Sequence, residues 1–171
     1  MKISIAQLAE GEHEYAFDFL RSDVELDDSY GYDYPIHLEV RLTKMGDEYL
    51  VQGEVTTRAN LVCDRCAEPF VAEIRDRMLI LYTLSGKVIP PEEEKRYDEI
   101  RRIEPSDLEI DIGDDVRQTL ILAIPWKRLC SPECRGLCPR CGANLNVEPC
   151  RCPEPVVDPR WESLKKLMER G

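Results

Sequence analysis

The chain of 171 residues is poor in histidine and aromatic residues and has no long apolar segment. No apolar run approaches the roughly 20 residues that a transmembrane helix needs, so we expect no membrane association. The first ten residues hold one Lys and an interrupted apolar stretch, so we also expect no signal peptide and a cytoplasmic protein. The G-x-S-x-G, P-loop and Rossmann glycine patterns are absent, which excludes the enzyme classes that depend on them.

Positive charge is also in deficit. The chain has 34 acidic and 23 basic residues and a net charge of -11. Proteins that hold phosphate backbones by themselves are usually basic or carry a basic stripe, so the simplest nucleic-acid-binding class is excluded. The acid is concentrated in residues 1–57, which hold 13 acidic and 4 basic residues. This end suits a basic protein partner, because complementary charge steers association.

Cysteine, in contrast, is abundant and clustered. A chain that is not exported meets a reducing cytosol, where eight thiols do not become four structural disulfides. Tight grouping is instead typical of metal ligation, and zinc is the metal that four thiolates favour. The expected ligands are Cys63, Cys66, Cys130, Cys134, Cys138, Cys141, Cys150 and Cys152.

Alternating apolar and polar residues predict a strand-rich first half. This alternation covers residues 12–20, 36–43, 49–61 and 70–82. Cys63 and Cys66 then fall at the turn between two long strands, which we interpret as the tip of an antiparallel ribbon. A bound metal would clamp this tip.

The second half is expected to add a short strand and two helices. Residues 108–112 predict the strand. Asp114 is a good N-cap for the next helix, whose apolar stripe ends at Pro125 and should pack on the sheet. Residues 158–159, Asp-Pro, predict the start of a C-terminal helix. Residues 85–97 are expected to form a polar loop.

These elements predict an α+β fold. It should combine a mostly antiparallel β-sheet that carries a long ribbon, one packed helix, a Cys-rich zinc module and a C-terminal helix. Two domains are expected. Residues 1–125 should form a β-rich domain with a zinc-knuckle hairpin tip, and residues 126–171 the Cys-rich zinc module with the C-terminal helix.

Eight cysteines make two four-thiolate zinc sites, and two partitions are open. A C-x-x-C pair lets both sulfurs reach one ion, and Gly142 after the second pair allows a left-handed backbone there. The favoured partition joins the last four cysteines locally, which needs little loop closure, and joins the first four in the other site. The alternative joins the two C-x-x-C pairs in a zinc ribbon and leaves the other four together.

Four thiolates would close each site, whereas a catalytic zinc keeps an open position and usually includes His, Glu or Asp. His13 and His37 lie on expected strands far from the cysteines, and we interpret both as solvated strand residues. An iron–sulfur cluster is the alternative cofactor.

Four blocks of the sequence carry a family pattern. They are Cys63-Asp-Arg-Cys-Ala-Glu-Pro-Phe70, the segment from Cys130 to Asn146, Cys150-Arg-Cys152, and the segment from Asp158 to Leu167. In this order they resemble the YceD family of bacterial large ribosomal RNA subunit accumulation proteins. The resemblance implies a cytoplasmic, non-enzymatic factor that promotes accumulation of large-subunit ribosomal RNA.

Two functional hypotheses follow. The first is a zinc-binding, non-enzymatic factor in ribosome biogenesis, without a small-molecule substrate, that binds a basic ribosomal protein, ribosomal RNA of the large subunit, or both. The second is a thiol-redox or metal-dependent enzyme, which requires a reactive thiol or an exchangeable metal position.

Possible RNA contacts lie around the cysteines, where basic side chains could touch the backbone and an aromatic ring a base. They are Trp126, Lys127, Arg128, Arg135, Arg140 and Arg151. These bases could equally offset the thiolates. Each filled site carries about -2, which takes the chain to about -15 and favours a protein partner.

Overall fold

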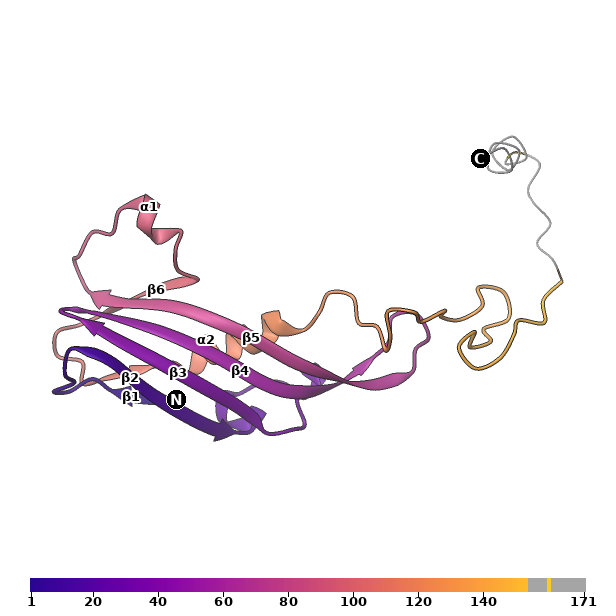
Figure 1. Ribbon diagram of the computed structural model, residues 1–171, viewed down its shortest axis with the longest axis horizontal. Coiled ribbons are helices and arrows are strands. Elements are labelled where there is room, and N and C mark those ends of the chain that lie inside the picture. Colours follow the sequence, from indigo (N-terminus) through magenta and orange to yellow (C-terminus); the bar gives the residue numbers. More distant parts are fainter. Residues whose placement is uncertain (154–159, 161–171) are drawn as a thin grey trace.

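The computed structural model describes residues 1–153 and residue 160. A five-stranded sheet in the order β2-β3-β4-β5-β6 forms the body, beside a two-stranded sheet of β1 and β7 (Figure 1). Among the described residues, every strand pair is antiparallel except β5 with β6, which is parallel. The expected α+β class with a mostly antiparallel sheet is confirmed. The strands are β1 (Lys2–Ser4), β2 (Gly11–Phe19), β3 (Ile36–Met45), β4 (Glu48–Val62), β5 (Pro69–Leu84), β6 (Glu99–Ile103) and β7 (Glu109–Asp111). The helices are α1 (Pro91–Glu94) and α2 (Gly113–Ala123), with 3-10 turns η1 (Arg21–Val24) and η2 (Asp28–Tyr30).

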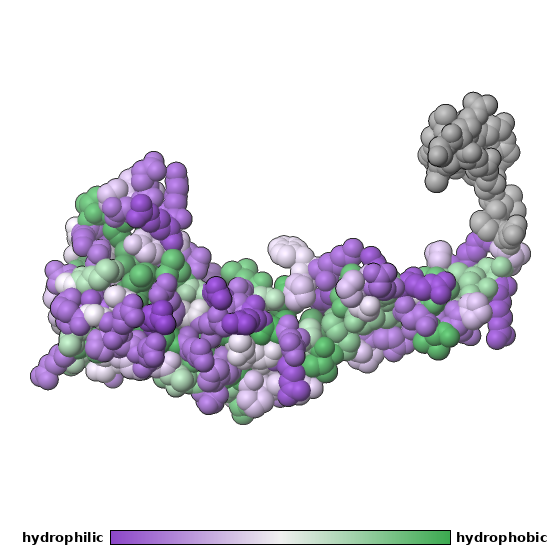
Figure 2. Space-filling view, in the orientation of Figure 1, coloured by the Kyte–Doolittle hydropathy of each residue, from purple (hydrophilic) through white to green (hydrophobic). Residues whose placement is uncertain are grey.

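Alternation builds the two faces of the large sheet. Leu38 of β3, Val55 of β4 and Ile74 of β5 point into the core and are at most 5% exposed. Their chain neighbours point outward, and hydrophilic side chains cover most of the body on the face seen in Figure 2. The four strands expected from period-two alternation are confirmed as β2 to β5.

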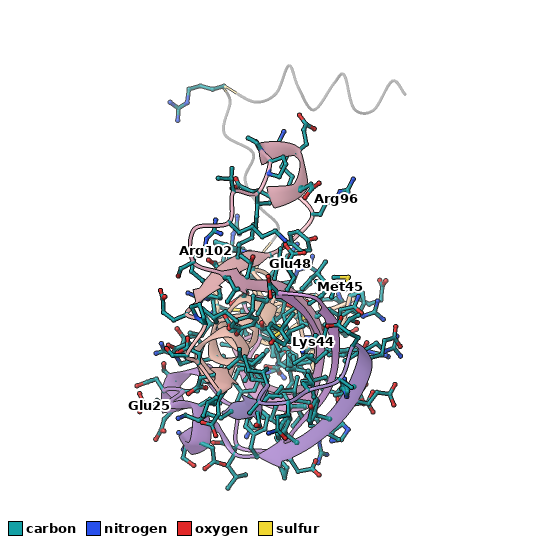
Figure 3. The ribbon with its side chains drawn as sticks, turned by 90° about the vertical axis from the view of Figure 1, so that its left-hand side faces the viewer. Glu25, Lys44, Met45, Glu48, Arg96 and Arg102 are labelled. Atoms are coloured by element: carbon teal, nitrogen blue, oxygen red, sulfur yellow. The ribbon has the colours of Figure 1, made fainter. Side chains whose placement is uncertain are left out.

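Helix α2 covers the inner face of the sheet. Its Val116 and Leu120 are fully buried, and the Tyr32 hydroxyl donates to the Leu120 carbonyl at 2.7 Å. Figure 3 looks along the molecule from the end that carries Lys44, Met45 and Glu48, and shows the strands curving around the helix.

The expected N-cap of this helix, Asp114, is wrong by two residues. Helix α2 begins at Gly113 with Ile112 as its N-cap, not at Asp114. The Asp111 carboxylate accepts the Gly113 amide at 2.9 Å, so the chain enters the helix earlier. Asp114 lies in the first turn, where the helix dipole favours an acid.

The short elements complete the body. Strand β7 confirms the strand expected near Ile110, which is 1% exposed and pairs with Ile3 of β1. Residues 85–97, expected as a polar loop, also contain the four-residue helix α1. This loop is the crossover that returns β6 parallel to β5, because parallel neighbours cannot be joined by a tight hairpin.

Strands β4 and β5 run on beyond the body. Strand β3 accompanies β4 only as far as Thr56, whereas β5 pairs with β4 to its end at Val62 and Pro69. Beyond Thr56 the segment that contains η2 lies along β4, where the Asn60 amide donates to the Gly31 carbonyl at 2.8 Å. The two strands continue past it as a ribbon that reaches away from the sheet (Figure 1). The chain that follows α2 runs to the ribbon tip. The expected C-terminal helix lies outside the described residues, and in the part that the structure describes no helix is long and apolar enough to cross a bilayer.

Candidate metal centres

The ribbon tip folds into a tight knuckle that presents Cys63 and Cys66. The Cys63 amide donates to the Glu68 carbonyl, and the Ala67 amide donates to the Cys63 carbonyl, each at 2.9 Å. Ala67 has a left-handed backbone with φ of 57°. This turn brings both sulfurs to the same side of the tip.

A second knuckle of the same design follows at Cys138 and Cys141. The Cys138 amide donates to the Ala143 carbonyl at 2.8 Å, and the Gly142 amide to the Cys138 carbonyl at 2.9 Å. Gly142 has φ of 74°, so the left-handed backbone expected at this glycine is confirmed. Two C-x-x-C sequences, which differ only in the first of their two intervening residues, thus adopt one hydrogen-bond pattern.

The first thiol group consists of Cys63, Cys66, Cys130 and Cys134. The Sγ atoms of Cys63 and Cys134 lie 3.8 Å apart, and those of Cys66 and Cys130 lie 3.7 Å apart. All but Cys130 are buried, and Phe70 packs against the group. The group joins the ribbon tip to a segment more than sixty residues later in the chain.

Polar contacts hold these two segments together independently of the sulfurs. The Asp64 carboxylate accepts the Arg128 amide at 2.7 Å and its guanidinium at 3.1 Å, and the Asp64 amide donates to the Arg128 carbonyl at 2.8 Å. The Arg65 guanidinium donates to the Cys134 carbonyl at 2.7 Å. Both residues between the first pair of cysteines therefore position the second pair.

The second thiol group consists of Cys138, Cys141, Cys150 and Cys152. The Sγ atom of Cys150 lies 3.2 Å from that of Cys138 and 3.8 Å from that of Cys141, and Cys138 and Cys152 lie 4.0 Å apart. Only Cys138 is buried. The two groups are those of the partition favoured from the sequence, not those of a ribbon that joins both knuckles.

The sulfur spacing fits one tetrahedrally bound ion in each group. A Zn–S bond of about 2.3 Å gives a tetrahedron with S···S edges of about 3.8 Å. The first group has edges of 3.7 and 3.8 Å, and the second has edges of 3.2, 3.8 and 4.0 Å, the first of which is shorter than the ideal edge. The sulfurs of each group all lie within 4.8 Å of one another, close enough to share one ion. A disulfide needs an S–S distance of about 2.05 Å. A four-iron cluster gives each thiolate its own iron and so spreads the sulfurs further apart.

Comparison with known proteins assigns the chain to a family. The family model described as large ribosomal RNA subunit accumulation protein YceD matches residues 51–168, more than half of the chain. The chain belongs to the YceD family. The matched segment begins in β4 and contains the ribbon tip and both thiol groups.

Curated relatives of this YceD protein occur in mycobacteria and plants. An uncharacterised protein of Mycobacterium tuberculosis is 29% identical over 133 residues, which are 78% of this chain and 62% of that protein. The "Large ribosomal RNA subunit accumulation protein YCED homolog 1, chloroplastic" of Zea mays is 29% identical over 142 residues, 69% of this chain and 48% of that protein. The Arabidopsis thaliana protein of the same name is 26% identical over 158 residues, 80% of this chain and 49% of that protein.

The chain spans about six tenths of the length of the mycobacterial relatives and about half that of the plant ones. No solved structure matches it. The names of the family and of its plant members describe accumulation of an RNA.

Electrostatics within each thiol group of this YceD protein oppose full ionisation. Backbone amide donors, led by that of Cys130, lower the pKa of Cys63 to about 6, whereas desolvation of the sulfur atom and the neighbouring Cys134 and Cys66 sulfurs raise the pKa of Cys130 to about 12. In the second group, amides led by that of Cys141 lower the pKa of Cys138 to about 6, while the neighbouring Cys150 sulfur raises the pKa of Cys152 to about 12. A dication would remove this repulsion, because ligand thiols ionise on binding.

Two asparagines beside the thiols escaped the sequence-based prediction. The Asn146 side-chain amide donates to the Cys134 sulfur at 3.3 Å, and its oxygen accepts the Arg135 amide at 2.7 Å. The Asn144 amide donates to the Glu68 carboxylate at 3.3 Å. Asparagine is common in turns for local reasons, so its presence alone gave no signal of a long-range role.

The expected RNA contacts are scattered over this end of the molecule. Trp126 is fully exposed. Arg128 is paired with Asp64, and the Arg140 guanidinium donates to the Pro153 carbonyl at 2.9 Å. Lys127, Arg135 and Arg151 are exposed. RNA contact by these six residues stays a prediction.

Neither histidine belongs to a thiol group. His13 lies on β2 and His37 on β3, and both are partly exposed. His13 contacts the Ala9 carbonyl, whereas His37 lies between Asp18 and Glu39.

Proposed function

We propose that this YceD protein is a cytoplasmic, non-enzymatic factor that holds two zinc ions and supports accumulation of large-subunit ribosomal RNA. The observation that carries the proposal is the convergence of eight thiols into two groups of four in a chain of this family. The names of the plant relatives support the same role. The zinc would be structural, because four thiolates leave no coordination position open for a substrate.

In this proposal the first group would hold the zinc that fastens the ribbon tip to the segment after α2. The second would hold the zinc that shapes residues 138–152. Zinc is favoured because all eight donors are sulfur and their spacing fits one ion per group.

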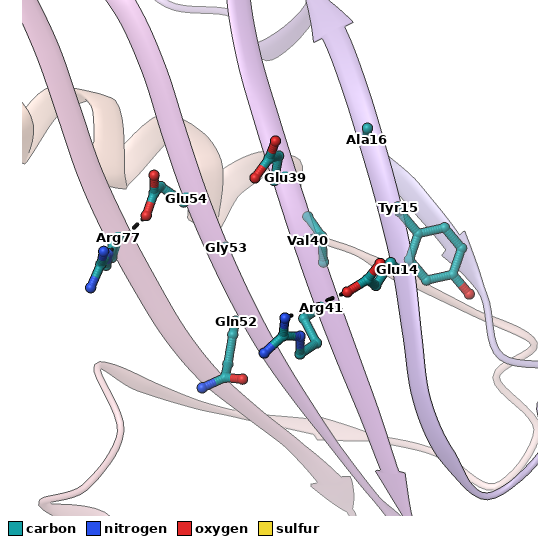
Figure 4. Close-up of a pocket in the computed structure, with 10 residues that line it drawn as sticks. All are labelled: Glu14, Tyr15, Ala16, Glu39, Val40, Arg41, Gln52, Gly53, Glu54 and Arg77. Carbon is teal, nitrogen blue, oxygen red and sulfur yellow. Dashed lines mark hydrogen bonds and ion pairs between the residues drawn. The ribbon is translucent and has the colours of Figure 1, made fainter.

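The partner that we favour is a basic ribosomal protein bound by the outer face of the sheet. A hollow of about 570 Å³ on this face is lined by Glu14, Glu39, Glu54, Arg41 and Arg77, among others (Figure 4). Glu54 is paired with Arg75 and Arg77, whereas Glu39, directly opposite it in the register of β3 and β4, contacts no Lys or Arg in the described residues. A cationic partner could pair with Glu39 and with the neighbouring acids of β2.

The zinc sites oppose direct RNA binding at the other end of the chain. Each filled site would carry about -2 beside the basic residues expected to touch RNA. Arg128 and Arg140 are also occupied within the protein. RNA is therefore the second candidate partner, supported by the fully exposed Trp126.

Metal content is the first test of the proposal. Metal analysis of the purified chain should give two zinc ions and no rapidly reacting thiol. A reactive thiol or an exchangeable metal would instead support the thiol-redox or metal-dependent enzyme.

Charge reversal then tests the partner. Glu12 and Glu14 of β2 and Glu39 of β3 are exposed acids of this outer face. The triple variant Glu12→Lys, Glu14→Lys, Glu39→Lys should lose capture of ribosomal proteins from lysate at low salt and lower the ratio of large- to small-subunit RNA in complemented cells. The matched control, Glu92→Lys, Glu93→Lys, Glu94→Lys, changes the charge equally on the exposed helix α1 and should behave as the parent protein. Equal capture by both variants would overturn the acidic face as the binding surface.

A further inference from the structure

The two thiol groups are connected by more than the chain between them. Residues 142–149 join the two halves of the second group and fold back on the first. The Leu145 amide donates to the Gly136 carbonyl at 2.9 Å, and Leu137 pairs with Asn144 in an antiparallel bridge. The Leu137 amide in turn donates to the Arg65 carbonyl at the ribbon tip, at 3.0 Å.

Close packing fixes this arrangement at Gly136. Its φ is +76°, and a Cβ at this position would lie 3.0 Å from the Arg65 carbonyl oxygen. The segment that enters the second group is therefore pressed against the residue between Cys63 and Cys66.

Asn146 makes the direct link between the groups. Its amide donates to the Cys134 sulfur, a ligand of the first site, and also to the Asn144 oxygen at 2.9 Å. An N–H donated to a thiolate stabilises the negative sulfur and orients it. Asn146 itself lies within the loop that the second site closes between Cys141 and Cys150.

We propose that the two sites bind zinc cooperatively and that Asn146 couples them. This rests on the proposed metal binding and adds to it an interaction between the sites. Closing the loop at the second site fixes Asn146 before the first ion binds, so the first site binds more tightly. By linkage, zinc at the first site strengthens the second by the same factor.

The test measures the zinc affinity of the first site in the full chain, by competition with a chromophoric chelator. The variant Cys150→Ser, Cys152→Ser removes two ligands of the second site. It should weaken the first site by about 10-fold to 100-fold, the usual effect of losing an outer-sphere partner. Asn146→Ala should weaken the first site similarly, and combining it with the cysteine changes should add little.

The variant Asn146→Asp separates the hydrogen bond that Asn146 donates to Cys134 from the one that it accepts from Arg135. Aspartate keeps the oxygen that accepts the Arg135 amide but cannot donate to Cys134. It should weaken the first site at least as much as alanine does. Gln118→Ala is the matched control, because it removes an exposed side-chain amide on helix α2, outside the ribbon tip and the second thiol group.

The possible outcomes separate the two proposals. A chain that binds no zinc contradicts the metal sites themselves. If the parent chain binds two zinc ions but the first site keeps its affinity in the Cys150→Ser, Cys152→Ser variant, only the coupling is overturned. A parent-like affinity in Asn146→Asp overturns Asn146 as the residue that carries it.

Discussion

Ala67 occupies a backbone conformation that suits glycine better. Its φ of 57° is left-handed, and the matching position in the second knuckle is Gly142. An L-residue in this conformation is destabilised by about 1–2 kcal/mol, part of which is offset because alanine restricts the unfolded chain.

Ala67→Gly should therefore raise the stability of the zinc-loaded protein by about 1 kcal/mol or less. Denaturant unfolding followed at the ribbon tip measures the change. The reciprocal variant Gly142→Ala should weaken the second knuckle by a similar amount. A clear loss of stability in Ala67→Gly would show that the left-handed turn is not strained.

The contacts of His37 should make the stability of the protein depend on pH. Hydrogen bonds to Asp18, and secondarily to Glu39, raise the pKa of its imidazole. A raised folded pKa stabilises the protonated form, so the contribution is fully present below the unfolded pKa of about 6.5. It is lost as the pH rises through the folded value.

His37→Gln should be less stable than the parent protein at pH 5.5 and nearly equal to it at pH 8, by urea unfolding. The difference should be small, because the pair is exposed and screened by solvent. His13→Gln is the control, since its ring contacts a carbonyl and not a carboxylate. An equal loss for His37→Gln at both pH values would contradict this origin.

At the scale of elements, Gly31 and Gly46 allow the cost of a steric overlap to be compared with the cost of backbone strain alone. A Cβ on Gly31 would lie 2.1 Å from the Asn60 carbonyl oxygen, so Gly31 lets the η2 segment dock on β4. A Cβ on Gly46, in the β3–β4 turn, would meet nothing within 4 Å. Both have positive φ, at 74° and 61°.

Gly31→Ala should destabilise the protein by well over about 2 kcal/mol, because strain and overlap with backbone combine. Gly46→Ala should lose only about 1 kcal/mol from strain. Urea unfolding of both variants gives the comparison. Equal losses would mean that the contact with Asn60 relaxes without cost.

The elements that the sequence predicts are those whose side chains alternate over many residues. Strand β3 alternates buried Leu38 with exposed Glu39, so its face and length can be predicted locally. Strand β6 could not be predicted from local alternation, because its five residues include two adjacent arginines. Its partner β5 also lies on the other side of a loop. Strand β1, with three residues, is too short for a pattern.

The same contrast holds at the thiol groups. Cysteine is chemically distinctive, and the short loop that joins the last four cysteines favours their grouping in one site. Asp64 and Asn146 act through hydrogen bonds to segments that only the tertiary structure brings near. The division at residue 125 and the C-terminal helix stay predictions.

At the scale of the whole molecule, two separate clusters hold the fold together. The main apolar core includes Val55, Ile74 and Leu120, whereas Cys63, Cys66 and Cys134 form a cluster of their own at the ribbon tip. Metal removal should therefore act on one part of the protein.

Removing zinc with a chelator should raise amide hydrogen exchange in residues 60–72 and 126–153 and leave β2 and β3 protected. Exchange followed by mass spectrometry, with and without chelator, measures this. Restoration by added zinc is the control for irreversible damage. Uniform exchange over the whole chain would contradict a locally acting metal.

Side-chain alternation restricts the lengths that the β4–β5 ribbon can have. Side chains alternate along β4, so Cys63 faces the same way as Val55 only because an even number of residues separates them. Removing one residue from each strand would turn the thiols to the opposite side of the ribbon. Ribbons of different length can therefore place Cys63 and Cys66 on the same side only when each strand differs by an even number of residues.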